Sequence, residues 1–172
     1  SITATPLNRN LRVDYTISFT PSNTIPAGGS IQITFPTTYN SLDSTCRVIR
    51  GLTASASGLS CTADSTTKTV VITGFTETPP QFIQIKIYAT NPNDIGFTPQ
   101  FQIASFTSAV PSPTTLIDEN EKAGQVSIAD VDNPFLVEID VYTAYTNTSL
   151  DNSGPLDFRL YPQTALPITP AT

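Results

Sequence analysis

The sequence contains no histidine, no methionine and no tryptophan, and only 13% of its 172 residues are charged. Without histidine the chain has no Ser-His-Asp or Cys-His nucleophile system, no imidazole base near neutral pH and no His-ligated zinc or haem. Most classes of hydrolase and metalloenzyme are therefore excluded. We expect a protein that is not an enzyme and that carries no cofactor and no metal.

Basic residues are also scarce, since 8 Lys and Arg stand against 14 Asp and Glu, and the net charge is -6 at pH 7. Nucleic acids and anionic membranes are bound through clustered basic side chains. The basic residues here are scattered, so neither partner is expected. The sequence has no apolar run of about 18 residues and no basic-then-apolar leader at Ser1, which predicts neither membrane insertion nor a retained signal peptide.

What the chain does contain is a repeated alternation of apolar and polar residues, with no competing helical period. Val13, Tyr15, Ile17 and Phe19 occupy alternate positions, which is the pattern of a half-buried strand. The same pattern returns in three further segments, which are 31–35, 83–87 and 101–103. Turn signals rich in Pro, Gly and Asn separate these segments. The sequence therefore predicts an all-β protein in which residues 1–106 form an Ig-like antiparallel β-sandwich.

The two cysteines, Cys46 and Cys61, would close a loop of about 15 residues. An even number of cysteines in a Ser- and Thr-rich chain without histidine favours a disulfide and an extracellular location. Oxidation would stabilise the fold by roughly 3 kcal/mol. Two buried free thiols are the alternative, and a zinc site lacks further ligands of suitable type.

The later part of the chain resembles its opening. Residues 127–144 match residues 1–19 in their apolar pattern, and residues 154–162 match residues 29–36, at an offset of about 125 residues in both cases. An internal repeat would restart the sandwich near residue 125 and stop after its first strands. The alternative is chance similarity, because any two amphipathic strands look alike.

Residues 107–124 lie between the two blocks, contain two prolines and a charge run, and are predicted to be a linker. Residues 125–172 would then be an incomplete second sandwich, too short to bury its own apolar residues. The predicted assembly surface consists of Val137, Ile139, Val141, Leu156, Phe158 and Leu160. The missing strands could come from the first domain of the same chain, or the chain could be an excerpt of a longer array.

Completion by another copy is the hypothesis that we favour. It would be a β-strand addition between subunits. Because the incomplete end and the completing surface are different patches, the contact is head-to-tail, and such a contact grows a filament when it does not close into a ring. The predicted partners are therefore copies of this chain in a homopolymer.

Three segments carry a resemblance to a known group of proteins. They are "YTISFTPSNTIPAGGSIQITFP" (Tyr15 to Pro36), the pair Cys46 and "GLSC" (Gly58 to Cys61), and "IQIKIYATNP" (Ile83 to Pro92) followed by "FQIASF". Together they resemble the repeated Ig-like β-sandwich units of extracellular fibre and surface proteins, including large repeat proteins of protist cell surfaces. The resemblance covers about the first 106 residues. It implies a secreted or surface-displayed structural role, often with glycans, and no catalytic residue.

Covalent glycans are expected at two places. Asn147 begins the N-x-Ser/Thr sequon Asn147-Thr148-Ser149 in a predicted loop. Thr114 and Thr115 stand in a Pro-flanked hydroxyl tract typical of O-glycan acceptors. In both cases the alternative is an unmodified polar segment.

A calcium site is disfavoured, because no spacing matches an EF-hand loop and an acidic solvated linker explains the same residues; its candidate ligands would be Asp118, Glu119, Glu121, Asp130, Asp132 and Asn133. A lysine isopeptide crosslink is disfavoured as well, since Lys86 should point outward between two core positions.

The alternative function is a surface adhesin or carbohydrate-binding module. It would use aromatic side chains that the strand pattern does not commit to a core, namely Tyr39, Tyr142, Tyr145 and Tyr161. Binding of sugars by a monomer would favour it over the filament.

Overall fold

The computed structural model describes residues 1–130, 138–142 and 157–161. The chain divides into two units, Ser1–Val131 and Asp132–Thr172, and each is described by itself. The described elements are thirteen strands and one short 3-10 helix, which confirms the all-β class. Within this described part, no helix is long and apolar enough to cross a membrane.

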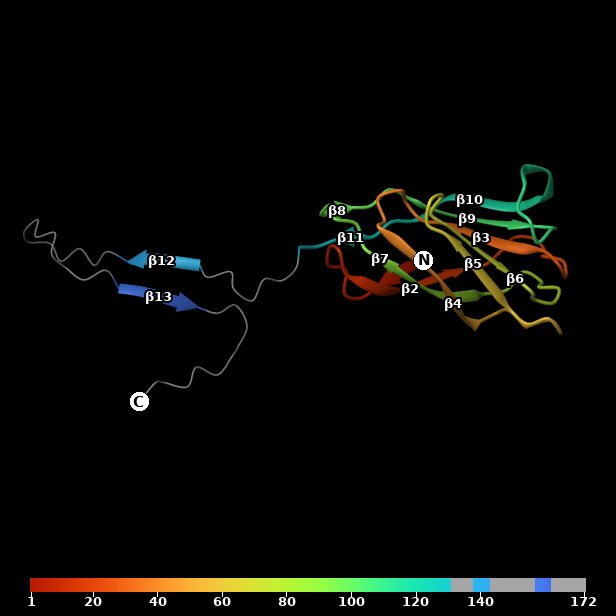
Figure 1. Ribbon diagram of the computed structural model, residues 1–172, viewed down its shortest axis with the longest axis horizontal. Coiled ribbons are helices and arrows are strands. Elements are labelled where there is room, and N and C mark those ends of the chain that lie inside the picture. Colours follow the sequence, from red (N-terminus) through yellow and green to blue (C-terminus); the bar gives the residue numbers. More distant parts are fainter. Residues whose placement is uncertain (131–137, 143–156, 162–172) are drawn as a thin grey trace, which may run out of the picture. The chain divides into compact units, whose positions relative to one another are not determined.

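The first unit is a sandwich of two antiparallel sheets (Figure 1). The strands of one sheet, in their spatial order, are β1 (Ile2–Ala4), β2 (Arg12–Phe19), β7 (Ile83–Thr90) and β4 (Ser41–Arg50). The strands of the other are β10 (Leu116–Gly124), β9 (Phe101–Phe106), β3 (Ser30–Thr34), β6 (Thr69–Thr73) and β5 (Ser60–Asp64). Strands β1, β2 and β7 in one sheet and β3, β9 and β10 in the other give the core arrangement of the immunoglobulin-like fold.

Strand β2 shows how the alternating pattern becomes a sheet. Tyr15 and Ile17 are fully buried and lie opposite Ile87 and Ile85 of β7. The residues between them face outward, because successive side chains of a strand point to opposite faces. Lys86 therefore lies on the outer face, as the sequence predicts, with its Nζ 3.8 Å from the Asp14 carboxylate.

The centre of the core is a cluster of four aromatic rings from Tyr15, Phe35, Tyr39 and Phe101. Their centroids are 4.9 to 6.0 Å apart, mostly in edge-on contacts. Such pairs contribute about 0.5–1.5 kcal/mol beyond the burial of their area. Tyr39 is only 1% exposed, so the expectation that it is available to hold sugar is wrong.

The segment predicted to be a linker, residues 107–124, belongs to the first unit. It contains a 3-10 turn (Pro113–Thr115) and the whole of β10, which pairs with β9 from Leu116 to Gly124. The unit continues through β11 (Ser127–Ile128), which pairs with β8 (Gly96–Phe97). Both Val126 and Ile128 are buried in the core. The first domain therefore extends beyond residue 106, because strand pairing and core burial extend to this point.

In the second unit, the described residues form β12 (Glu138–Tyr142) and β13 (Asp157–Tyr161), which pair antiparallel along their full length. An internal repeat would make β12 and β13 the counterparts of β2 and β3. However, β2 and β3 lie in opposite sheets, whereas β12 and β13 are hydrogen-bonded neighbours. The described part of the second unit therefore does not reproduce the opening of the first.

Candidate functional site

The pairing of β12 with β13 brings together four of the six predicted assembly residues. Ile139 lies opposite Leu160, and Val141 lies opposite Phe158. The other two residues, Val137 and Leu156, lie outside the described residues, as do Asn147 and Tyr145. Within the described part, β12 and β13 form a two-stranded sheet. A two-stranded hairpin is only marginally stable in water, and a third strand or another packing partner is needed for independent stability.

The predicted disulfide is confirmed, since Cys46 of β4 is bonded to Cys61 of β5 with their Cα atoms 5.8 Å apart. These strands are the end strands of the two sheets. The bond therefore joins the sheets at one side of the sandwich. It fixes β5, whose other side chains are mostly exposed, against the opposite sheet.

Strand β5, which carries Cys61, ends at Asp64, and a tight turn follows. The Oδ1 of Asp64 accepts hydrogen bonds from the backbone N–H groups of Thr66 at 2.7 Å and Thr67 at 3.3 Å. These bonds, led by that from Thr66, lower the pKa of the exposed Asp64 carboxyl. The end of β5 therefore carries a fixed negative charge at neutral pH.

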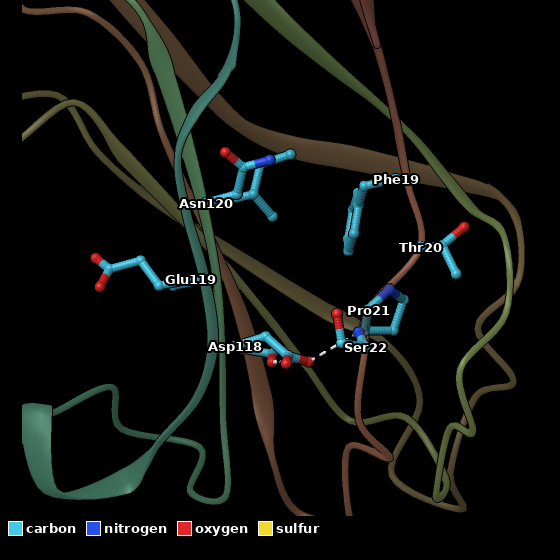
Figure 2. A pocket seen from close by; sticks show the side chains of 10 residues that line it. Phe19, Thr20, Pro21, Ser22, Asp118, Glu119 and Asn120 are labelled. Atoms are coloured by element: carbon cyan, nitrogen blue, oxygen red, sulfur yellow. Dashed lines mark hydrogen bonds between the residues drawn. The ribbon is translucent and has the colours of Figure 1, made fainter.

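A surface pocket of about 230 Å³ lies between the end of β2 and strands β9 and β10 (Figure 2). It is lined by Phe19, Thr20, Pro21, Ser22, Ile103, Ala104, Ser105, Asp118, Glu119 and Asn120. The Asp118 carboxylate accepts hydrogen bonds from the backbone N–H groups of Ser22 and Asn23 at 3.2 and 3.1 Å. The amide of Asn23 donates a third bond at 2.7 Å. Asp118 thus fixes the loop after β2.

Among the residues considered for calcium, Asp132 and Asn133 lie outside the described residues, and the others form no metal-binding group. Asp118 binds the loop after β2, and Asp130 forms an ion pair with Arg9 at 2.9 Å. In the described ranges, no group of three or more acidic or cysteine side chains is placed to hold a metal ion.

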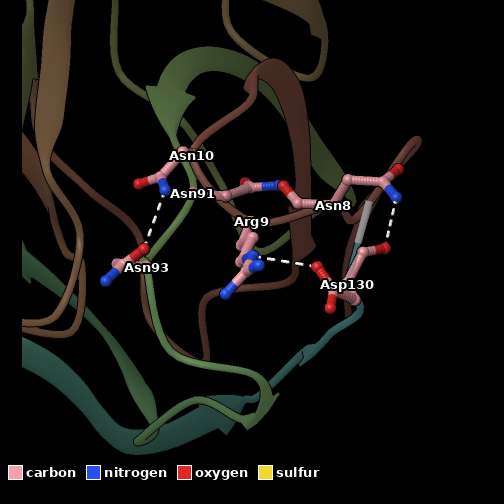
Figure 3. Close-up of polar contacts among 6 residues, drawn as sticks. All are labelled: Asn8, Arg9, Asn10, Asn91, Asn93 and Asp130. Carbon is pink, nitrogen blue, oxygen red and sulfur yellow. Dashed lines mark hydrogen bonds and ion pairs between the residues drawn. The ribbon is translucent and has the colours of Figure 1, made fainter. Parts of the chain in front are cut away.

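An asparagine-rich network ties the two ends of the first unit together (Figure 3). The Asn8 amide donates to the carbonyl oxygen of Asp130 at 2.7 Å, and the Asn91 amide donates to the carbonyl oxygen of Asn8 at 2.6 Å. The Asn10 amide donates to Asn93 at 2.8 Å. Backbone bonds from Ala129 to Leu7 and from Arg9 to Ala129 add a short parallel pairing. No sequence motif predicts this network, and only the turn-forming Asn and Pro residues mark the segments that carry it.

The same network reaches the aromatic core through Asn91, which is fully buried. The Tyr15 hydroxyl donates to its Oδ1 at 2.5 Å, and the Tyr39 hydroxyl donates to that of Tyr15 at 3.0 Å. Desolvation raises the pKa of Tyr15 to about 12. Burial, followed by the hydrogen bond to Tyr15, raises the pKa of Tyr39 as well. Both phenols are therefore neutral over the physiological range.

The two predicted O-glycan acceptors differ in their surroundings. Thr114 is exposed on the 3-10 turn. Thr115 is half-buried, and its hydroxyl lies within hydrogen-bond distance of the backbone N–H and carbonyl of Ser112, at 3.1 and 3.0 Å. A sugar on Thr115 would disrupt this turn, whereas one on Thr114 would not.

The chain matches no protein-family model and no curated protein. One solved structure to which it is similar is an uncharacterized protein from Nocardia farcinica with an immunoglobulin-like fold. The two are 16% identical, with a TM-score of 0.47, and the match covers 75% of this chain and 96% of that one. The immunoglobulin-like class assigned here rests on the strand order of the first unit.

Proposed function

We propose that this protein is a noncatalytic structural subunit of an extracellular filament, and that copies assemble head-to-tail by β-strand addition. The observation that carries the proposal is the two-stranded sheet of β12 and β13 in a unit separate from the first sandwich. Its apolar positions are in register and alternate with polar ones. Since a hairpin gains stability when further strands join it, a strand from another copy would complete this second unit.

An extracellular location is part of the proposal and is supported by the disulfide, because such bonds persist in oxidising compartments. The role is the one expected of repeated Ig-like units in surface proteins, including those of protists. N-glycosylation at Asn147 and O-glycosylation at Thr114 belong to the same proposal, with Thr115 the poorer acceptor for the reason given above.

The test is sedimentation velocity over a range of concentrations on the full chain and on a chain ending at Val131. The shorter chain keeps every core residue of the first unit, so it should fold and sediment as a monomer. The full chain should form larger species as its concentration rises. A full chain that stays monomeric at all concentrations, and binds sugars on a glycan array, would instead favour the adhesin.

Two full-length variants serve as matched controls. Val141→Pro removes a backbone donor and disfavours pairing within β12, and it should reduce assembly to the level of the shorter chain. Asn147→Gln removes the sequon but lies outside both strands, so it should assemble as the unaltered chain does. Equal assembly by the Val141→Pro variant would count against strand addition.

A further inference from the structure

The first sandwich has four end strands, and three of them carry features that protect an edge from pairing. Strand β1 has only 3 residues. Strands β4 and β10 are interrupted by register shifts. They also carry exposed charges, which are Arg47 and Arg50 on β4 and Glu119, Glu121 and Lys122 on β10. Short length, bulges and charges are the usual means by which natural sheets prevent edge-to-edge association.

Strand β5 lacks the bulges and most of the charge. Its five residues pair with β6 in unbroken register, from Ser60 opposite Thr73 to Asp64 opposite Thr69. Its outward residues are Ser60, Thr62 and Asp64, and only the last is charged. Cys61 and Ala63 face the core but are only half-buried. A strand added beside the last three residues of β5 would cover Ala63.

The disulfide makes this edge a rigid one. Cys61, near the middle of β5, is bonded to β4 of the opposite sheet. Strand addition costs less conformational entropy when the accepting strand is already fixed. The edge of β5 is therefore both regular and preorganised.

The second unit supplies strands of matching length and pattern. Strands β12 and β13 have five residues each, as β5 does. Strand β12 carries two carboxylates, Glu138 and Asp140, whereas β13 carries Asp157 and Arg159. Because like charges on neighbouring strands destabilise pairing and opposite charges stabilise it, β13 is the better neighbour for a strand ending in Asp64.

We propose that the outer edge of β5 accepts β13 from a second copy of this chain, antiparallel, with Arg159 opposite Asp64. This alignment sets Leu160 opposite Ala63 in the core-facing row and Tyr161 opposite Thr62 in the outer row, so the last three residues of β13 pair with the last three of β5. It joins the sheet of β10, β9, β3, β6 and β5 to the hairpin of the next subunit. The inference rests on the proposed function and names the surface that the hairpin binds.

The first test is Thr62→Lys in the full chain, measured by sedimentation velocity. Thr62 is exposed, so the melting temperature should not change, while a lysine on the edge should raise the dissociation constant by at least about tenfold. Thr3→Lys on the exposed edge of β1 is the matched control and should assemble normally. Normal assembly of the Thr62→Lys variant, or loss of assembly in Thr3→Lys alone, would overturn the assignment to β5.

The second test is a double-mutant cycle between the two charges. Asp64→Asn keeps an oxygen acceptor for the Thr66 N–H and removes the charge. Arg159→Gln removes the charge of β13. Each variant should weaken assembly, and the double variant should lose less than the product of the two single effects. Strictly multiplicative losses would overturn the alignment of Arg159 with Asp64.

The two proposals fail in different ways. If the chain ending at Val131 loses assembly but Thr62→Lys keeps it, the hairpin drives assembly and only its acceptor is misassigned. If the unaltered full chain does not assemble at any concentration, the proposed function itself is wrong.

Discussion

At the scale of single residues, Asn91 joins the aromatic core to the ends of the first unit. Its side chain accepts from Tyr15 and donates to the backbone of Asn8, and its carbonyl oxygen accepts from the amide of Asn40 at 3.1 Å. A buried polar side chain with satisfied partners fixes one arrangement of the elements around it. Asn91 therefore helps to hold the segment before β2 in place.

Replacing Tyr15 by phenylalanine should destabilise the first unit by about 1–3 kcal/mol, because it leaves the buried Oδ1 of Asn91 without its donor. Chemical denaturation of the chain ending at Val131 would measure this loss. The matched variant Tyr88→Phe alters an exposed tyrosine and should change the free energy of unfolding by less than about 0.5 kcal/mol. Equal effects of the two variants would contradict the role of the buried network.

The stability of the first unit should fall as the pH rises above 10. In the unfolded chain a tyrosine ionises near pH 10, whereas burial raises the pKa of Tyr15 to about 12 and that of Tyr39 further. Above pH 10 the folded state therefore binds more protons than the unfolded state, and stability decreases with pH. The melting temperature, measured between pH 8 and pH 11, should stay constant up to about pH 10 and fall above it. The control is the double variant Tyr15→Phe with Tyr39→Phe, whose melting temperature should not change over this range.

At the scale of elements, the apolar alternation of the sequence predicts β2, β3, β7 and β9, whereas β10 is predicted to be a linker. Strands β2, β3 and β7 were predicted because residues such as Val13, Ile33 and Ile85 alternate with polar ones. In β10 none of the residues is fully buried, so its composition resembles a linker. Tyr39 was missed because it lies in a turn, and only tertiary packing brings it to Phe35 and Tyr15.

The candidate site was predictable to a similar degree. The Cys46–Cys61 bond follows from cysteine number, and the positions of Ile139, Val141, Phe158 and Leu160 follow from alternation. The choice of β5 as the accepting strand cannot be predicted from the sequence, because it depends on register and bulges that arise only when the strands pair.

Truncation should show whether the first domain ends near residue 106 or extends to residue 131. A chain ending at Ala109 lacks β10, β11 and the buried residues Val126 and Ile128. Exposing apolar residues that these strands cover should leave it unfolded or aggregated, whereas the chain ending at Val131 should unfold cooperatively. Circular dichroism melting curves measure the difference. A cooperative transition in the chain ending at Ala109 would instead place the end of the first domain near residue 106.

The disulfide should contribute measurably to the stability of the first unit. Replacing both Cys46 and Cys61 by alanine opens a loop with a sequence separation of 15, and a loss of about 3 kcal/mol is expected. The comparison of the oxidised chain with its reduced form, under the same denaturant series, checks that the loss comes from the bond. An unchanged midpoint on reduction would contradict this.

At the scale of the whole molecule, the described residues form a two-sheet sandwich in the first unit and a two-stranded sheet in the second. The first unit has a continuous core and mostly protected edges. The second unit, where described, is a hairpin with five paired positions. Under the proposed function, the first unit is stable as a monomer and the second unit gains stability on association.

Hydrogen exchange measured as a function of protein concentration tests this account most directly. The amides of residues 138–142 and 157–161 should exchange rapidly in dilute solution and become protected as the concentration rises, while those of β2 and β7 stay protected throughout. Protection of the hairpin at every concentration would show that the second unit is completed within one chain, and rapid exchange at every concentration would show that it is not completed at all. Either result would contradict assembly by strand addition.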